Sequence, residues 1–317
     1  MAVYTPLRQD QVAEFIDTFG FVRLRKLKAT DSGIENTNYF VTADDRTGHT
    51  CNLVLTLFEQ MPLTELPYFV ALTSFLAQAG LPVPAPYRTK QGEAILQLEG
   101  KPAIIVPCFN GRHPSEPSHL QCSAIAEAMA RMHLASEHFT EHRENDRGAS
   151  WREEAVNTLQ PFLTPEQRSL LMSQVADWRL HQSQIDELPA GINHHDLFHD
   201  NALFDGDQLT GIIDFYNACD DCFIYDLAVL VNDWCSDQQG ELEPQRYRAV
   251  LDTYQRLRPF TPAEHRLWPR MLAFAALRFW ISRLLSWHSP SLHTVTQKNP
   301  MAMQKLLELR LTNHDID

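Results

Sequence analysis

The chain has 317 residues, enough for one large domain or two lobes, and 44% of them are hydrophobic, so it can bury a core. Its formal net charge of −13 makes nucleic acid an unexpected partner, because an acidic protein repels phosphate backbones. A phosphorylated cofactor can still bind where a metal ion neutralises the local charge. We find no secretory leader, no apolar run of membrane length and no regular cysteine spacing, which predicts a cytoplasmic protein with reduced thiols and no membrane contact.

The first third of the chain is predicted to be rich in β-strands. An amphipathic helix is expected over residues 5–19, and a second helix over residues 64–78, where one side is apolar and Gly80 ends the helix. Apolar runs bounded by turn residues predict strands over residues 21–28, 39–43, 51–58, 94–98 and 101–108. The last two of these strands are expected to form a β-hairpin.

The rest of the chain is predicted to be mainly helical. Helical periodicity is present over residues 120–138, 151–163, 165–182 and, in several helices, 226–287. A short β-rich island over residues 192–215 interrupts these helices. We therefore expect an α+β fold with a β-rich nucleotide-binding lobe at 1–108 and a helical lobe at 109–317. A cleft between two such lobes is a common place for a ligand.

The island is part of the most informative segment of the chain, GINHHDLFHDNALFDGDQLTGIIDFYNACDD. Its two short strands, over residues 202–204 and 208–213, are expected to be joined by a two-residue turn at Asp205-Gly206. This register would place residue 197 opposite Asp214. The open end of the hairpin would then gather three side chains that bear acceptor oxygens, those of Asp196, Asn201 and Asp214.

Two carboxylates and an amide in one place suit phosphoryl transfer. Mg²⁺ prefers oxygen ligands, usually one or two carboxylates together with substrate phosphates, and a carboxylate that is free of metal can accept a proton from a hydroxyl. The alternative is that these are ordinary surface turn residues. Their spacing argues against it, because His194-x-Asp196 followed by Asn201 matches the H-x-D-x-x-x-x-N loop of kinases. Asp214 then matches the metal-binding Asp that follows this loop in kinases.

This motif resembles that of the aminoglycoside phosphotransferase and choline kinase superfamily, and further segments resemble its homoserine kinase branch. They follow one another in family order over nearly the whole chain. The segments are SGIENTNYFV (32–41), LVLTLFE (53–59), LPYF (66–69), GKPAIIVPCFNG (100–111), REN-RG-W (143–151), HHDLFHDN (194–201), IIDFYNAC (212–219), YDLAVLVNDWC (225–235) and LRFWISRL (277–284).

The resemblance implies a two-lobed, protein-kinase-like fold, ATP and Mg²⁺ as cofactors, and a role for each matching residue. Asp196 would be the catalytic base, and Asn201 and Asp214 would hold Mg²⁺. His194 and Asp226 are expected to be structural, with Asp226 either capping a helix or bracing the catalytic loop. The residues expected to contact ATP are Ser32, Gly33, Asn36, Val106, Cys108 and Phe109.

One position departs from the protein-kinase pattern. Protein kinases carry a Lys on the third strand, whereas this chain has Thr56 there. The homoserine kinases look similar at this position, so the missing Lys does not by itself indicate an inactive enzyme. The phosphates must then be neutralised by other groups, for which the backbone N–H groups of residues 31–38 and Mg²⁺ are candidates. The missing Lys also motivates a different hypothesis, a nucleotide-binding pseudokinase, although the complete catalytic motif counts against it.

The acceptor implied by the resemblance, homoserine, carries a carboxylate and an ammonium group. Candidates for binding its carboxylate are Arg143, Arg147, Arg278 and Arg283, and candidates for binding its ammonium are Asp233, Trp234 and Trp280. Each arginine is more commonly part of a structural ion pair, and Trp280 is more commonly a core residue. Cys219 and Cys222 have the spacing of half a zinc site, but without a second pair they are better interpreted as free thiols.

The sequence thus predicts a kinase that transfers the γ-phosphoryl group of ATP to the side-chain hydroxyl of homoserine, which the resemblance places in threonine biosynthesis. Kinases of methylthioribose, choline or aminoglycosides are alternatives within the same class. The sequence predicts no oligomeric state.

Overall fold

The computed structural model describes residues 4–30, 36–288 and 298–312, and the chain divides into two compact units. The first comprises residues up to Arg112 together with Thr210–Ile213, and the second comprises His113–Leu209 and the chain from Asp214 onward. The predicted lobes, 1–108 and 109–317, differ from these units in the boundary and in the placement of residues 210–213. Within the described residues, no helix combines the length and apolar character needed to cross a bilayer.

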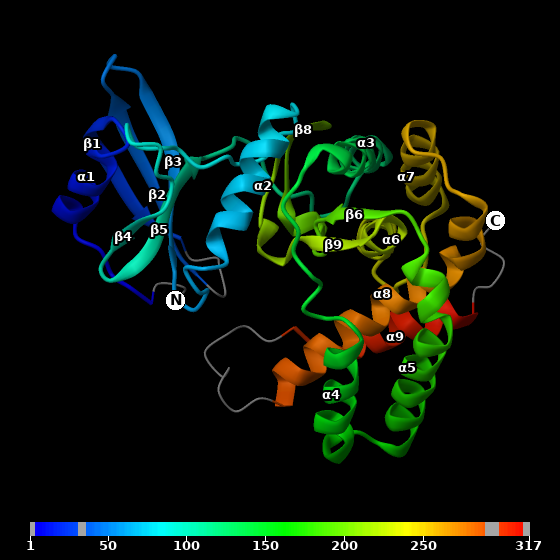
Figure 1. Ribbon diagram of the computed structural model, residues 1–317. Coiled ribbons are helices and arrows are strands. Elements are labelled where there is room, and N and C mark those ends of the chain that lie inside the picture. Colours follow the sequence, from blue (N-terminus) through cyan, green and yellow to red (C-terminus); the bar gives the residue numbers. More distant parts are fainter. Residues whose placement is uncertain (1–3, 31–35, 289–297, 313–317) are drawn as a thin grey trace. The chain divides into compact units, whose positions relative to one another are not determined.

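The first unit is built on an antiparallel sheet with the strand order β1-β2-β3-β5-β4 (Figure 1). Its strands are β1 (Phe21–Ala29), β2 (Asn36–Asp45), β3 (Thr50–Phe58), β4 (Leu96–Leu98) and β5 (Lys101–Pro107). Its helices are α1 (Gln9–Asp17) and α2 (Leu66–Gln78). These elements lie close to their predicted positions, because each is marked by its own apolar pattern and by the glycine and proline residues that bound it.

The core of this unit lies on one face of the sheet. Leu55 and Leu57 of β3 are completely buried there, against Val12 of α1. Successive side chains of a strand point to opposite faces, so Thr56 lies on the other face, where its hydroxyl donates a hydrogen bond to Oδ1 of Asn38 at 2.7 Å. The position of the kinase lysine is therefore part of a neutral hydrogen-bonded pair.

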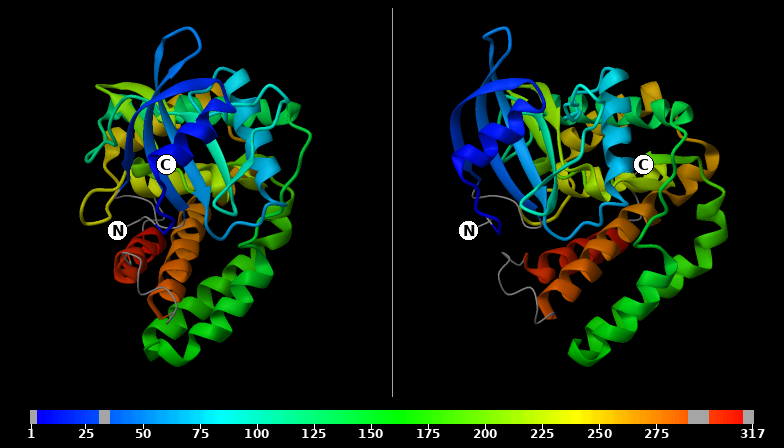
Figure 2. Two further views of the ribbon diagram at one scale, coloured as in Figure 1. Left: turned by 90° about the vertical axis from the view of Figure 1, so that its left-hand side faces the viewer. Right: turned by 60° about the vertical axis from the view of Figure 1, so that its left-hand side comes forward.

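The second unit is mainly helical, and Figure 2 shows α4 and α5 side by side with α8 passing next to them. Ser118 and Thr164 begin α3 and α5 with reciprocal hydrogen bonds to the glutamine three residues on, a pattern that satisfies the free N–H groups of a helix start. The helices are α3 (His119–Ala135), α4 (Ala149–Leu159), α5 (Pro165–Asp186), α6 (Phe223–Trp234), α7 (Pro244–Leu257), α8 (Pro262–His288) and α9 (Pro300–Thr312).

Two small sheets accompany these helices. β6 (Ala190–Asn193) pairs antiparallel with β9 (Cys219–Cys222), and β7 (Ala202–Asp205) pairs with β8 (Gln208–Ile212). The end of β8 belongs to the first unit, where the amide of Ile212 donates to the carbonyl of Pro82. Gly211 lies beside the ring of Phe109, and a Cβ on this glycine would come within 2.6 Å of that ring.

The structure corrects the predicted hairpin by one residue. Its turn is Gly206–Asp207 rather than Asp205-Gly206, which removes the expected pairing of residue 197 with Asp214. Both dipeptides contain the glycine that a turn of this kind needs, and Gly206 adopts a φ of 59°. The sequence did not predict β9, whose centre is the acidic pair Asp220-Asp221, or helix α9.

Candidate active site

The predicted catalytic loop connects β6 to β7 in the second unit. β6 brings Asn193 opposite Cys219 of β9, and the loop begins directly after this pair. His194, His195, Leu197 and Phe198 are buried, whereas Asp196 between them is partly exposed. The buried residues anchor the loop on both sides of the Asp196 carboxylate.

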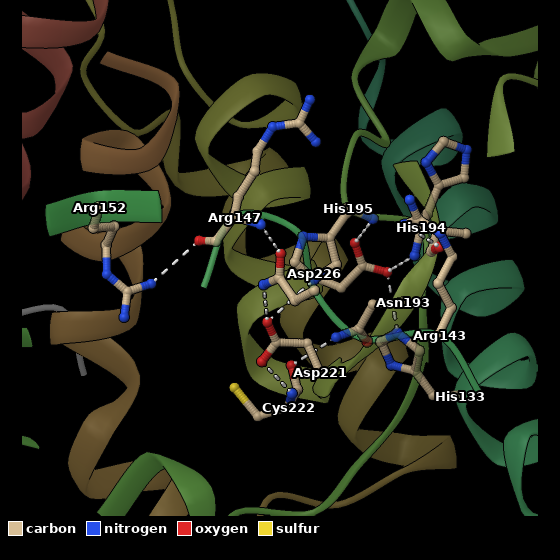
Figure 3. Close-up of polar contacts among 12 residues, drawn as sticks. His133, Arg143, Arg147, Arg152, Asn193, His194, His195, Asp221, Cys222 and Asp226 are labelled. Carbon is tan, nitrogen blue, oxygen red and sulfur yellow. Dashed lines mark hydrogen bonds and ion pairs between the residues drawn. The ribbon is translucent and has the colours of Figure 1, made fainter. Parts of the chain in front are cut away.

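Asp226 of α6 holds the start of this loop (Figure 3). Its carboxylate accepts hydrogen bonds from the amides of His194 and His195, each at 2.8 Å, and lies 3.3 Å from Nε2 of His133. Nδ1 of His133 is 2.6 Å from the hydroxyl of Tyr254. Burial opposes the charge of Asp226, but the hydrogen bond from His133 and the electrostatic interaction with nearby histidines outweigh it and hold the pKa of this carboxyl below its usual value. Asp226 therefore braces the loop and is not a helix cap, since the N-cap of α6 is Cys222.

His195 is held in an unusual conformation. Its φ of 64° lies in the left-handed region, and its ring lies against that of Tyr225 with centroids 4.9 Å apart and the two planes tilted by 34°. Nε2 lies 3.3 Å from Oδ2 of Asp221, which also accepts a hydrogen bond from Asn145 at 2.6 Å. Burial lowers the pKa of His195, but the sulfur of Cys219 and the Asp221 carboxylate more than offset this and raise the pKa to about 10. A cationic His195 thus ties the loop to β9.

The end of the loop is fixed by helix α6. His199 donates its backbone amide to Asp233 at 2.6 Å, and its Nδ1 lies 2.7 Å from the same carboxylate oxygen. The indole N–H of Trp234 donates to the carbonyl of Leu197 at 2.9 Å. Asp233 and Trp234, predicted to bind the acceptor ammonium, thus position the loop, and the completely buried Trp234 has no face open to a ligand.

The carboxyl of Asp196 is surrounded by charges of both signs. Burial is the main influence and raises its pKa to about 6, and nearby Asp200 adds to this increase. The positive charges of Arg278, Lys298 and Arg147 act in the opposite direction and favour the carboxylate. Asp196 is therefore mostly ionised near neutral pH while it can still take up a proton, as a general base requires.

Asn201 and Asp214 have side chains that suit a hard cation. Nδ2 of Asn201 donates to the carbonyl of Asp196 at 2.7 Å, which leaves the carboxamide oxygen as an acceptor. Asp214 follows β8 in a left-handed conformation, with a φ of 65°. Among the residues that the structure describes, no cluster of three or more His, Cys, Asp and Glu side chains could hold a metal by itself. A divalent ion held here would need phosphate oxygens as further ligands.

The predicted nucleotide contacts lie in the first unit. Ser32 and Gly33 fall outside the described residues, and Asn36 begins β2 opposite Phe58. Val106 of β5 pairs with Val54, and the amide of Cys108 already donates to the carbonyl of Asn52 at 3.0 Å. If residues 106–109, the predicted connector between the two lobes, bind adenine, the donor must be a backbone group other than the Cys108 amide.

The predicted acceptor-binding arginines differ in their surroundings. Arg147 donates to Asn217 at 2.7 Å, and Arg283 to the carbonyl of Asn299 at 3.4 Å. Arg143 is paired with Asp146. Trp280 is completely buried in α8.

Sequence reasoning missed several residues that build this site. Asn145, His195, His199, Asp221 and Lys298 all hold the loop or influence Asp196. Three of them stand inside the segments REN and HHDLFHDN that carried the resemblance. No local pattern marked them, because the groups that they contact or influence are mostly distant in sequence.

Asp226→Ala should destabilise the protein by about 3–5 kcal/mol, because it leaves two buried amides and the His133 N–H without an acceptor. The matched control is Asp237→Ala, since Asp237 also accepts two backbone amides but is exposed, so that water replaces it. Urea unfolding followed by circular dichroism measures both. Equal losses in the two variants would contradict the bracing role of Asp226.

Comparison with known proteins places the chain in a family. Residues 26–260 match the phosphotransferase enzyme family. The homoserine kinase of Methylobacillus flagellatus is 41% identical over 309 residues, which cover 97% of this chain and 95% of that protein. The homoserine kinase of Pseudomonas aeruginosa is also 41% identical, over 90% of this chain and 89% of that protein.

Solved structures give the same fold. The amicoumacin kinase hAmiN, in complex with AMP-PNP, Ca²⁺ and amicoumacin, superposes with a TM-score of 0.70 at 15% identity, over 97% of this chain and 94% of that one. Aminoglycoside 2′-phosphotransferase-IIIa gives a TM-score of 0.64 at 15% identity, over 96% of this chain and 97% of that one. The predicted α+β, protein-kinase-like fold class is confirmed. The predicted family is confirmed as well: the chain belongs to the phosphotransferase enzyme family, on the branch that contains the homoserine kinases.

Proposed function

We propose that this phosphotransferase moves the γ-phosphoryl group of ATP to the side-chain hydroxyl of L-homoserine and releases O-phospho-L-homoserine, a step of threonine biosynthesis in the cytoplasm. Relatives named homoserine kinase, about 40% identical over nearly the full length, support the substrate. The observation that carries the proposal is the braced loop that presents Asp196. Burial raises the pKa of its carboxyl to about 6, so this group can accept a proton near neutral pH.

Asp196 would orient the homoserine hydroxyl and accept its proton as the oxygen attacks the γ-phosphorus. Phosphoryl transfer has a loose transition state, so most of the catalysis comes from positioning and from compensation of charge on the phosphoryl oxygens. The bonds that Asp226, Asp233 and Trp234 make to the loop would keep Asp196 in place during this step. Arg147, Arg278 and Lys298 would stabilise the negative charge on the reacting oxygens near Asp196.

Asn201 and Asp214 would hold Mg²⁺, the usual divalent ion of ATP-dependent kinases. The complex of hAmiN with AMP-PNP and Ca²⁺ supports the use of a nucleoside triphosphate and a divalent ion in this fold. When bound, Mg²⁺ supplies positive charge to the β- and γ-phosphate oxygens. The oxygen of Asn201 is available for it, since the amide nitrogen is occupied by Asp196.

The first unit would bind the rest of ATP. Asn36, with Ser32 and Gly33, would cover the phosphates, and the Val106–Phe109 connector would contact adenine. The neutral pair Thr56–Asn38 gives no positive charge at the position of the kinase lysine. Backbone N–H groups of residues 31–38 and the metal ion would therefore neutralise the α- and β-phosphates.

Homoserine fits the surroundings of Asp196 better than choline does. A choline site needs exposed aromatic faces for its quaternary ammonium, but Trp234 and Trp280 are completely buried. The charges that influence Asp196 include three cations, Arg147, Arg278 and Lys298, which suit an acceptor with a carboxylate. Release of ADP in the presence of homoserine tests the proposal directly, and turnover of choline but not homoserine would overturn it.

Asp196→Asn should lower kcat by about 10²–10⁴-fold, because the amide cannot accept the hydroxyl proton. The fold should be unchanged, since the side chain is not part of the loop's bracing. Asp205→Asn, an exposed carboxylate in the same segment, is the control and should retain activity. Steady-state ADP release measures both, and full activity of the Asp196 variant would contradict its role as base.

The pH dependence of kcat/KM should follow the ionisation of Asp196. The carboxylate is the active form, so kcat/KM should be constant well above pH 6 and fall about tenfold per unit below it. Excess Mg²⁺ keeps ATP in its metal complex during the measurement. Asp200→Asn should shift the midpoint to lower pH, because Asp200 raises the pKa of Asp196. An unshifted midpoint would mean that another group titrates.

Asp214→Asn should increase the Mg²⁺ concentration needed for half-maximal activity. The increase should be at least the ~10–100-fold that loss of an outer-shell partner costs at other metal sites. Titration of ADP release with MgCl₂ measures it, with Asp205→Asn as the charge-matched control. An unchanged Mg²⁺ dependence would remove Asp214 from the metal site.

A further inference from the structure

Arg278 of α8 is a buried cation to which no described residue offers a hydrogen-bond acceptor or a counter-ion. Its side chain is 4% exposed, yet it forms no hydrogen bond or ion pair with any residue that the structure describes, and its Nε is completely enclosed. The three other buried arginines of this unit all have acceptors: Arg152 has Gln182, Arg258 has Glu264, and Arg310 has Asn232. A buried guanidinium is costly unless it is paired. Such a group in a folded enzyme points to a ligand that completes it.

The position of Arg278 links it to the catalytic loop. Its guanidinium lies 4.0 Å from the ring centroid of Phe279, and the edge of this ring meets Phe198 at 4.6 Å between centroids. Phe198 is two residues after Asp196 and donates its amide to the Asp196 carbonyl at 2.8 Å. Of the charged groups around Asp196, Arg278 is the one that favours its ionised form most. Arg278 therefore lies near the base but is not bonded to it.

A second polar group without a partner lies on the same face of the helix. Ser282 is one turn after Arg278, and residues four apart are neighbours on a helix surface. Its hydroxyl is enclosed and has no hydrogen-bond partner among the described residues. A guanidinium and a hydroxyl together present the donors that a carboxylate accepts.

The other cations near Asp196 are already engaged with the protein. Arg147 donates to Asn217, Arg283 to the carbonyl of Asn299, and Lys298 lies 3.3 Å from Asp200. Homoserine is short, so its carboxylate lies within roughly 5 Å of its hydroxyl by ordinary bond lengths. The group that binds this carboxylate must therefore be close to Asp196.

We propose that Arg278 binds the α-carboxylate of the acceptor, with the Ser282 hydroxyl as an additional donor, and so selects amino-acid alcohols over plain alcohols. This inference rests on the proposed homoserine kinase function. It predicts that the arginine is unfavourable for the stability of the empty enzyme, because only the substrate pairs it. Function and stability should therefore respond to its removal in opposite directions.

The test compares Arg278→Met with wild type on L-homoserine and on 3-amino-1-propanol, which lacks the carboxylate. The variant should lose about 10²-fold in kcat/KM for homoserine, as expected for charged hydrogen bonds, and less than about threefold for the amino alcohol. Its melting temperature without substrate should be equal to or above that of wild type. Arg270→Met, on the same helix but exposed and paired with Asp177, is the control and should change neither rate.

Binding of homoserine, measured by calorimetry with AMP-PNP and Mg²⁺ present, distinguishes a failure of the proposed function from a failure of the role assigned to Arg278. Wild type that neither binds nor phosphorylates homoserine would overturn the proposed function, and this inference with it. Wild type that binds homoserine while Arg278→Met binds it equally well would overturn only the inference. A large loss of melting temperature in Arg278→Met would likewise show that Arg278 is a structural residue.

Discussion

The buried carboxylate of Asp226 is the constraint on which the rest of the site depends. It is completely buried and accepts the two consecutive amides that open the catalytic loop. Without it, the turn at His195, which requires a left-handed backbone, would leave polar groups in the core without partners. His133 and Tyr254 extend this arrangement into α3 and α7, so three helices fix one loop.

The charge around Asp196 shows how an acidic protein can bind acidic ligands. The chain carries a net charge of −13, yet the positive charges of Arg147, Arg278 and Lys298 all influence the carboxylate of Asp196. Because electrostatic interactions are strong where water is excluded, these few cations outweigh the average charge of the surface. The pKa of Asp196 stays near neutral pH, and these cations suit an acceptor that carries a carboxylate.

The first unit differs from the protein kinases on its third strand, where Thr56 stands in place of the lysine. Thr56 and Asn38 satisfy each other by a hydrogen bond, so the position is stable without a cation. A lysine there would need a partner when no nucleotide is bound. In this chain the position of the kinase lysine therefore supplies no positive charge.

The sequence by itself determined the elements and the catalytic motif, because both are local. Apolar periodicity and turn residues predicted β1 to β5 and most helices to within a few residues, and the spacing of His194, Asp196 and Asn201 predicted the loop. The prediction failed at the turn around Gly206, where two adjacent dipeptides suit a two-residue turn equally well. It also failed at β9, because the acidic residues of this segment do not indicate a strand and its pairing with β6 cannot be seen in the sequence. Only the tertiary structure distinguished Arg278 from the other arginines. The absence of a partner depends on every residue that packs around a side chain, and those residues are scattered along the chain.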